Sequence, residues 1–198
     1  MAQRGVTVSY ESIRTWCEKF GCQYSKKIRR KRGPMGETWH LDEVYLKIDG
    51  QQKYLWRAVD QEGQVLDILV QAKRNKLAAA RFFKKVLRGT CQSPREVVTD
   101  KLAAYIQPCA RVLPSSAHTR DKGANNRAEN SHQPTRQRER RMKRFKSAAH
   151  AQRFLSIFSE VGNLFALSRH TVSATNHRLL LNKSLNTWSN LILDGEFQ

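Results

Sequence analysis

The chain has 198 residues, which suits one sizeable domain with at most a small appendage. Lysine and arginine outnumber aspartate and glutamate by 36 to 17, and the resulting net charge of +19 favours a polyanionic partner such as nucleic acid. Neither a signal peptide nor an apolar run of bilayer-spanning length is present, so we expect a cytoplasmic protein. A basic ribosomal component is an alternative that composition alone leaves open.

The four cysteines do not indicate a metal site. They are Cys17, Cys22, Cys91 and Cys109. None of them forms the CxxC pair typical of structural zinc sites, so we expect reduced thiols and no zinc ion.

The first predicted helix runs from Tyr10 to Phe20, with Ser9 as its N-cap and Gly21 as its C-terminal stop. Apolar residues recur at helical spacing and predict one buried face, formed by Ile13, Trp16, Cys17 and Phe20.

The other face of this helix is predicted to be exposed and to offer Arg14 and Lys19 to DNA. Residues 1–25 therefore fit either a partial helix-turn-helix or a plain amphipathic packing helix. Residues 26–36 follow as a basic linker, since charge runs are usually solvated.

Alternating apolar and polar residues predict an antiparallel meander of three strands, over residues 38–48, 53–60 and 65–71. Asp49-Gly50, between the first two strands, is a strong type I′ hairpin signal because both residues tolerate a positive φ. Asp60 ends the second strand and is expected to shape the next turn.

The remaining chain is predicted to contain more helix than strand. The predicted elements are a helix over 75–88, a short strand over 95–100, a brief helix over 101–106, a loop over 108–116, a short strand over 117–119 and mostly helix over 125–166. In the mixed tail, the expected packing residues are Leu179, Leu180, Leu181 and Trp188; Trp39 and Trp56 are expected in the main core.

Asp42 stands in the middle of the first strand, on the same side as Val44 and Leu46. An ionised carboxylate among aliphatic side chains is costly unless it is paired, hydrogen-bonded or bound to a metal. We therefore expect Asp42 to have a partner from elsewhere in the chain.

The order of the predicted elements is typical of a ribonuclease H-like α/β core, a mixed five-stranded sheet flanked by helices. In this core, acids converge from the middle of the first strand, the end of the fourth and the final helix. Here these acids are Asp42, Asp100 and Glu129. Carboxylates in such proximity need a cation to stay ionised, and their oxygens suit two divalent ions, Mg²⁺ or Mn²⁺. Two such ions can activate the attacking oxygen and stabilise the leaving oxygen of a phosphodiester.

Each of these residues also has a structural interpretation when taken singly. Asp100 can cap the helix that follows it, and Glu129 can be the capping-box partner of Asn126. His132 lies three residues after Glu129 and can share its helical face. It can orient a water or a phosphate there, or form only a structural hydrogen bond.

Basic residues are dense on both sides of Glu129. Those that we predict to bind DNA are Arg127, Arg136, Arg138, Arg140, Arg141 and Lys143. The alternative is a solvated basic surface without a dedicated ligand.

Four segments of the chain carry a family resemblance. They are residues 37–48 (ETWHLDEVYLKI), 54–67 (YLWRAVDQEGQVLD), 97–105 (VVTDKLAAY) and 123–147 (GANNRAENSHQPTRQRERRMKRFKS). These segments resemble the bacterial DDE transposases of the insertion sequence six family, and the likeness extends over nearly the whole chain.

The resemblance implies an integrase-type, ribonuclease H-like fold with a DDE triad on Asp42, Asp100 and Glu129. It also implies metal-dependent phosphodiester hydrolysis and strand transfer at insertion sequence ends. The expected partners are double-stranded DNA, as terminal inverted repeats and target, and further copies of the chain in a homodimer or larger homo-oligomer. The expected location is the bacterial cytoplasm, in association with the nucleoid.

Two departures from the family pattern affect these expectations. Only 28 residues, 101–128, separate Asp100 from Glu129, which is fewer than in the best-known members. The segment that matches residues 1–20 is internal in family members, so we expect a chain shortened at its N-terminus. The predicted domains are a partial helix-turn-helix (1–25), a basic linker (26–36), a catalytic domain (37–166) and a helical tail (167–198).

Two further functions compete with a working transposase. One is a catalytically silent DNA-binding remnant of a shortened transposase. The other is a different ribonuclease H-like nuclease, such as a retroviral-type integrase. An integrase would normally bring an N-terminal His₂Cys₂ zinc module, and no such spacing precedes Glu37.

Overall fold

The computed structural model describes residues 7–121, 123, 125–133, 145–166 and 173–193, apart from the side chains of residues 127, 129 and 130. The chain divides into two compact units, Pro34–Ser156 and Met1–Gly33 with Ile157–Gln198. Among the described residues, no helix combines the length and the apolar character that a membrane span needs.

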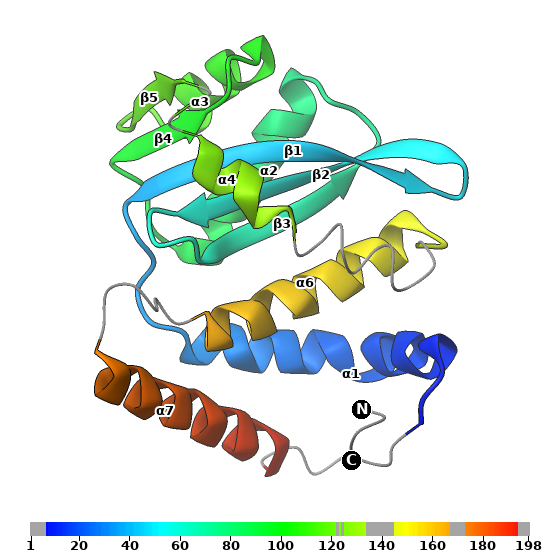
Figure 1. The fold of residues 1–198 in the computed structure, drawn as a ribbon. Helices are drawn as coiled ribbons and strands as arrows, with labels where there is room; N and C mark the ends of the chain where they lie inside the picture. Colours follow the sequence, from blue (N-terminus) through cyan, green and yellow to red (C-terminus); the bar gives the residue numbers. More distant parts are fainter. Residues whose placement is uncertain (1–6, 122, 124, 134–144, 167–172, 194–198) are drawn as a thin grey trace. The chain divides into compact units, whose positions relative to one another are not determined.

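The Pro34–Ser156 unit is built on a mixed five-stranded sheet in the order β3-β2-β1-β4-β5 (Figure 1). Its strands are β1 (Thr38–Ile48), β2 (Gln51–Asp60), β3 (Val65–Gln71), β4 (Glu96–Thr99) and β5 (Ala117–Arg120). The first three form an antiparallel meander, and β4 and β5 run parallel to β1. This sheet confirms the predicted fold class.

The turns of the meander follow the predicted chemistry. Asp49 and Gly50 both have positive φ, 49° and 73°, as a type I′ hairpin requires. Asp60 is 1% exposed and accepts hydrogen bonds from the backbone N–H groups of Gly36, Glu62 and Gln64 at 3.2, 3.0 and 2.9 Å. Asp60 therefore shapes the β2–β3 turn, as expected.

An apolar core fills one face of this sheet. Helix α2 (Lys76–Thr90) and the short helices η2 (Ala103–Tyr105) and α3 (Ile106–Val112) supply its other side. The largest buried side chains include Trp39, Trp56, Phe82, Phe83 and Tyr105. The Tyr105 ring lies 5.5 Å from Trp56 and 6.1 Å from Phe83, both at steep angles that suit edge-to-face packing.

Helix α4 (Asn126–Ser131) also belongs to this unit and packs on β1 and β2. The first half of α6 (Ala148–Phe165), up to Ser156, provides Gln152. Gln152 accepts a hydrogen bond from Val70 N at 2.8 Å and donates one to Ile68 O at 3.2 Å. These bonds satisfy backbone groups of edge strand β3 that would otherwise be open to another chain.

The loop predicted over residues 108–116 is wrong in its first half, because α3 continues to Val112. Pro108 is the third residue of this helix. In the first turn a backbone N–H has no partner within the helix, so proline costs no hydrogen bond there.

The other unit contains α1 (Tyr10–Lys31), the second half of α6 from Ile157 on, and α7 (Ala174–Leu193). Helix α1 does not end at Gly21 as predicted; it runs ten residues further and includes half of the basic segment expected as a linker. Gly21 serves close packing instead, since a Cβ there would lie 1.8 Å from Ile157 Cδ1.

The predicted buried face of α1 is correct only in part. Ile13, Cys17 and Phe20 are half-buried, but Trp16 is 45% exposed. The buried residues of α1 are Arg14, Gly21 and Ile28. In α7, Trp188 is half-buried, with its ring 6.2 Å from Tyr24 and 6.4 Å from Phe165, but Leu179 is 61% exposed.

The close approach at Gly21 yields a first prediction. Gly21→Ala should destabilise the protein by about 1–2 kcal/mol, because Ile157 must give way and the gain in helix propensity offsets only part of that cost. Gly162→Ala in α6 is the matched control, because within the described part of the chain nothing beyond its neighbours and its own helix backbone lies within 4 Å of the added Cβ. It should stabilise by about 0.5–1 kcal/mol. Urea unfolding of both variants measures the two shifts, and equal shifts would contradict the packing role of Gly21.

Candidate active site

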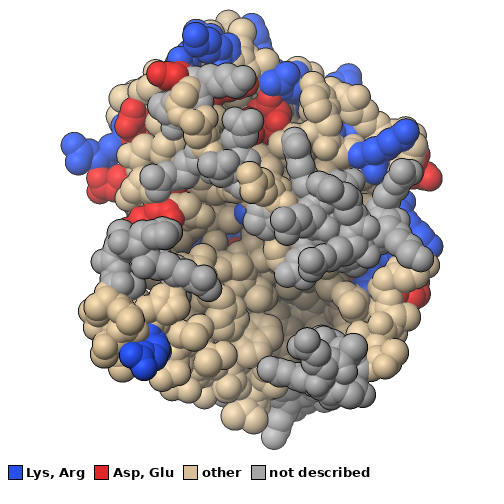
Figure 2. Space-filling view, in the orientation of Figure 1, with Lys and Arg blue, Asp and Glu red and all other residues tan. Residues whose placement is uncertain are grey.

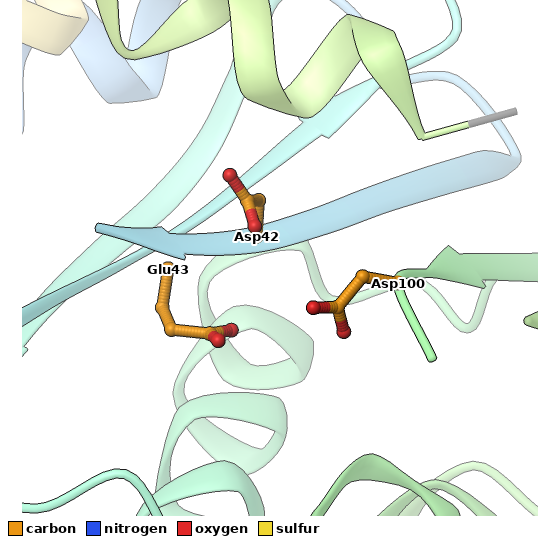
Figure 3. A group of neighbouring side chains, drawn as sticks. All are labelled: Asp42, Glu43 and Asp100. Carbon is orange, nitrogen blue, oxygen red and sulfur yellow. The ribbon is translucent and has the colours of Figure 1, made fainter. Parts of the chain in front are cut away.

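The parallel pairing of β1 with β4 brings two of the predicted acids together. The paired register ends at Leu41 and Thr99, so Asp42, still within β1, and Asp100, directly after β4, are the next residues along the chain. One carboxylate oxygen of Asp42, one of Glu43 and one of Asp100 all lie within 4.8 Å of one another. Figure 3 shows Asp42 and Glu43 on opposite sides of β1, with Asp100 projecting toward them from the end of β4.

Asp42 has the partner that its place in the strand demands. His132 Nε2 lies 3.4 Å from Asp42 Oδ2, and the His132 side chain is 1% exposed. Arg57 stands opposite Asp42 in the β1–β2 register and is 5% exposed. Burial lowers the pKa of Arg57 to about 10, a value that still leaves it cationic at neutral pH.

Asp100 is held by the backbone that follows it. Its Oδ1 accepts a hydrogen bond from Leu102 N at 2.9 Å. The helix-cap interpretation is wrong, because Leu102 is the N-cap residue of η2 and this helix has no side-chain cap hydrogen bond. Asp100 Oδ2 lies 3.5 Å from Arg74 Nη2. The side chains of Asp42 and Asp100 are 17% and 27% exposed, which leaves both carboxylates within reach of a substrate.

Glu43 is a member of the site that the sequence analysis missed. Its side chain is 1% exposed and accepts hydrogen bonds from Arg74 Nε and Tyr105 Oη. Burial raises the pKa of the Glu43 carboxyl, whereas these two hydrogen bonds and the Arg74 charge act in the opposite direction. The available signal was a second acid in β1, which needs a partner by the same argument as Asp42.

Asn125 fixes the start of α4 beside the acids. It is 3% exposed, and its Nδ2 donates a 2.7 Å hydrogen bond to Leu41 O, next to Asp42 in β1. Glu129 lies on α4, but its side chain is outside the described residues, so its approach to Asp42 stays a prediction.

The predicted DNA contacts are described only in part. Lys19 is exposed, with its Nζ 5.1 Å from the Phe20 ring centroid. Arg14 is only 9% exposed and forms an ion pair with Glu11 at 2.7 Å, so its expected exposure is wrong. The other predicted contacts lie outside the described part of the chain: the Arg127 side chain, Arg136, Arg138, Arg140, Arg141 and Lys143. In Figure 2, the described lysines and arginines on this face lie at several separate places.

The donor set fits a divalent cation. Carboxylate oxygens are the ligands that Mg²⁺ and Mn²⁺ prefer, and Asp42 and Asp100 can both contribute one to the same ion. Glu43 differs, because a donor from the protein already occupies each of its oxygens.

A mixed five-stranded sheet that places one partly exposed acid within β1 beside another directly after β4 is the architecture of a ribonuclease H-like polynucleotidyl transferase core of the integrase type. The family model described as a DDE domain, of the IS240 transposase type, matches residues 36–168. The chain belongs to this family of DDE transposases.

Curated relatives agree with this assignment. The transposase for insertion sequence-like element IS431mec of Staphylococcus aureus is 28% identical over 153 residues, 75% of this chain and 68% of the relative. The transposase for insertion sequence element IS257 in transposon Tn4003, also of Staphylococcus aureus, is 28% identical over 73% of this chain and 66% of its own length.

The fold has a counterpart among solved structures. A chain of the simian T-cell lymphotropic virus intasome, in complex with PP2A regulatory subunit B56 gamma, superposes with a TM-score of 0.51 at 14% identity. The match covers 71% of this chain and 53% of that one, and it supports the integrase-type fold alone.

The Asn125 bond yields a second prediction. Asn125→Ala should destabilise the protein by about 1–3 kcal/mol, because it leaves the buried Leu41 carbonyl without this donor. It should also lower DNA strand cleavage, because α4 would lose its anchor next to Asp42. Asn190→Ala, on an exposed position of α7, is the control. Wild-type stability and cleavage in Asn125→Ala would contradict the anchoring role.

Proposed function

We propose that this transposase cleaves phosphodiesters at the ends of an insertion sequence and joins the freed ends to target DNA, with Asp42, Asp100 and Glu129 as its catalytic acids. The observation that carries the proposal is the side-by-side placement of two partly exposed carboxylates by the β1–β4 register. The family's DDE domain, which spans residues 36–168, includes all three acids.

Two divalent cations, Mg²⁺ or Mn²⁺, would be held by Asp42, Asp100 and Glu129, and they would supply Lewis-acid activation of the attacking oxygen and stabilisation of the leaving oxygen. The protein's part is to hold the carboxylates in place. His132 contacts Asp42, while Leu102 N and Arg74 hold the two oxygens of Asp100. These contacts reduce the reorganisation needed when substrate arrives.

The reaction has two steps of the same chemistry. In the first, water attacks the phosphorus at the element's end, and the bond to the 3′ oxygen breaks to leave a free 3′-OH. In the second, this 3′-OH attacks a phosphodiester of the target, so that one P–O bond forms as another breaks. Neither step needs ATP or a covalent protein–DNA intermediate.

Positively charged side chains would bind the phosphates of the DNA partner. The net charge of +19 supports phosphate binding, and Lys19, Arg127 and the basic residues of 136–143 are the proposed contacts. Two DNA ends and a target must be held together, so we propose a homodimer or larger assembly as the working form. We propose a location in the bacterial cytoplasm in association with the nucleoid, which a DNA substrate and the bacterial curated relatives support.

A cleavage assay supplies the third prediction. Asp42→Asn, Asp100→Asn and Glu129→Gln should each reduce Mg²⁺-dependent 3′-end cleavage of a labelled inverted-repeat duplex by about 10³-fold or more, because each removes a charged ligand from the transition state. Asp49→Asn at the hairpin tip is the control and should cleave like the wild type, since Asn also tolerates positive φ.

Three outcomes would contradict the proposal. Undiminished cleavage in Asp42→Asn would remove the DDE assignment. DNA binding without cleavage by any variant, the wild type included, would favour the catalytically silent DNA-binding alternative. Hydrolysis of RNA–DNA hybrids in place of duplex ends would point to a different ribonuclease H-like nuclease.

A further inference from the structure

A chain of contacts links Asp100 to the buried core. Arg74, in the segment between β3 and α2, uses Nε for Glu43 and reaches Asp100 Oδ2 with Nη2 at 3.5 Å. Glu43 in turn accepts from the hydroxyl of Tyr105, a residue with no exposed surface. Arg74 therefore contacts both the buried Glu43 carboxylate and Asp100, one of the proposed catalytic carboxylates.

Solvent exposure differs between the two ends of this chain of contacts. The side chain of Glu43 is 1% exposed, that of Arg74 is 31% and that of Asp100 is 27%. Glu43 cannot follow a substrate, because the strand and the Tyr105 hydroxyl fix it on the core side of β1. The fixed end of the contact chain is thus Glu43, and the end open to solvent is Asp100.

Charge gives the arrangement a second property. Glu43 and Arg74 carry opposite unit charges, so together they add no net charge beside Asp42 and Asp100. Either one alone would change the charge felt at the catalytic carboxylates by a full unit within a few ångströms, in a part of the protein that water screens poorly.

We propose that Arg74 is a positioning residue for Asp100, and that the buried Glu43, held by Tyr105, fixes and neutralises Arg74 without itself binding the metal. This inference rests on the proposed metal-dependent function. The competing possibility is that Glu43 is a further metal ligand, because its carboxylate belongs to the same acidic group.

A charge-balance cycle separates the two roles. Mn²⁺ binding to the full-length chain is followed by calorimetry for the wild type, Glu43→Gln, Arg74→Gln and the double variant, with Asp42→Asn defining the specific signal. Glu43→Gln should weaken Mn²⁺ binding by about tenfold or more, since it leaves the Arg74 charge unopposed. Arg74→Gln should bind Mn²⁺ at least as tightly as the wild type, because it removes a positive charge near the carboxylates. The double variant should bind within about threefold of the wild type, because it removes one positive and one negative charge and so keeps the net charge unchanged.

Strand cleavage provides the second readout. Arg74→Gln and the double variant should cleave about tenfold or more slowly at saturating Mn²⁺, because Asp100 has lost its positioning contact although the ion still binds. Tyr105→Phe, which changes no charge, should alter Mn²⁺ affinity by less than about threefold. Circular dichroism checks that each variant is folded; Arg74→Gln, at a partly exposed position, tests the proposal even if Glu43→Gln does not fold.

The outcomes distinguish this inference from the function on which it rests. A double variant that binds Mn²⁺ as weakly as Glu43→Gln would make Glu43 a ligand and overturn the inference alone. Arg74→Gln with wild-type cleavage would overturn it as well. Absence of any Mn²⁺ binding that depends on Asp42 would overturn the proposed metal site and this inference together.

Discussion

The parallel pairing of β1 with β4 is the constraint on which the site depends. The strand pairing aligns Leu41 with Thr99, and the next residues along the chain, Asp42 and Asp100, therefore lie side by side. Two carboxylates at this separation repel each other, so the fold must provide positive or hydrogen-bonding groups around them. His132 meets Asp42, Arg74 meets Asp100, and a bound cation would complete the balance.

The alternation of side chains along β1 divides this neighbourhood into two environments. Asp42 lies on the side of the sheet that faces α4 and remains partly open to solvent, whereas Glu43 lies against the aromatic core around Tyr105. The same carboxylate chemistry therefore has different consequences on the two sides. On the open side it can meet a substrate, and on the core side it serves as an anchor.

Much of this arrangement followed from sequence, because strands, hairpins and helix signals are local. The meander, the I′ turn at Asp49-Gly50 and the convergence of Asp42 with Asp100 were predicted and are confirmed. Glu43 was missed, since its partners lie 31 and 62 residues away in segments without a periodic pattern. The end of α1 was misplaced for a related reason. Gly21 resembles a helix stop in the sequence, but in the fold its missing side chain makes room for Ile157, which is 136 residues away.

The hairpin formed by β1 and β2 also fixes which face of the sheet each acid of β1 occupies. In a strand, a shift of one residue exchanges the two faces, so a single insertion before Asp42 would send the aspartate into the aromatic core and the glutamate toward solvent. The ten paired positions from Trp39–Asp60 to Ile48–Gln51 oppose such a slip, because all of them would have to be broken together. The length of this hairpin thus determines which of the two acids lies on the open side of the sheet, and insertions should be tolerated at its tip far better than at its base.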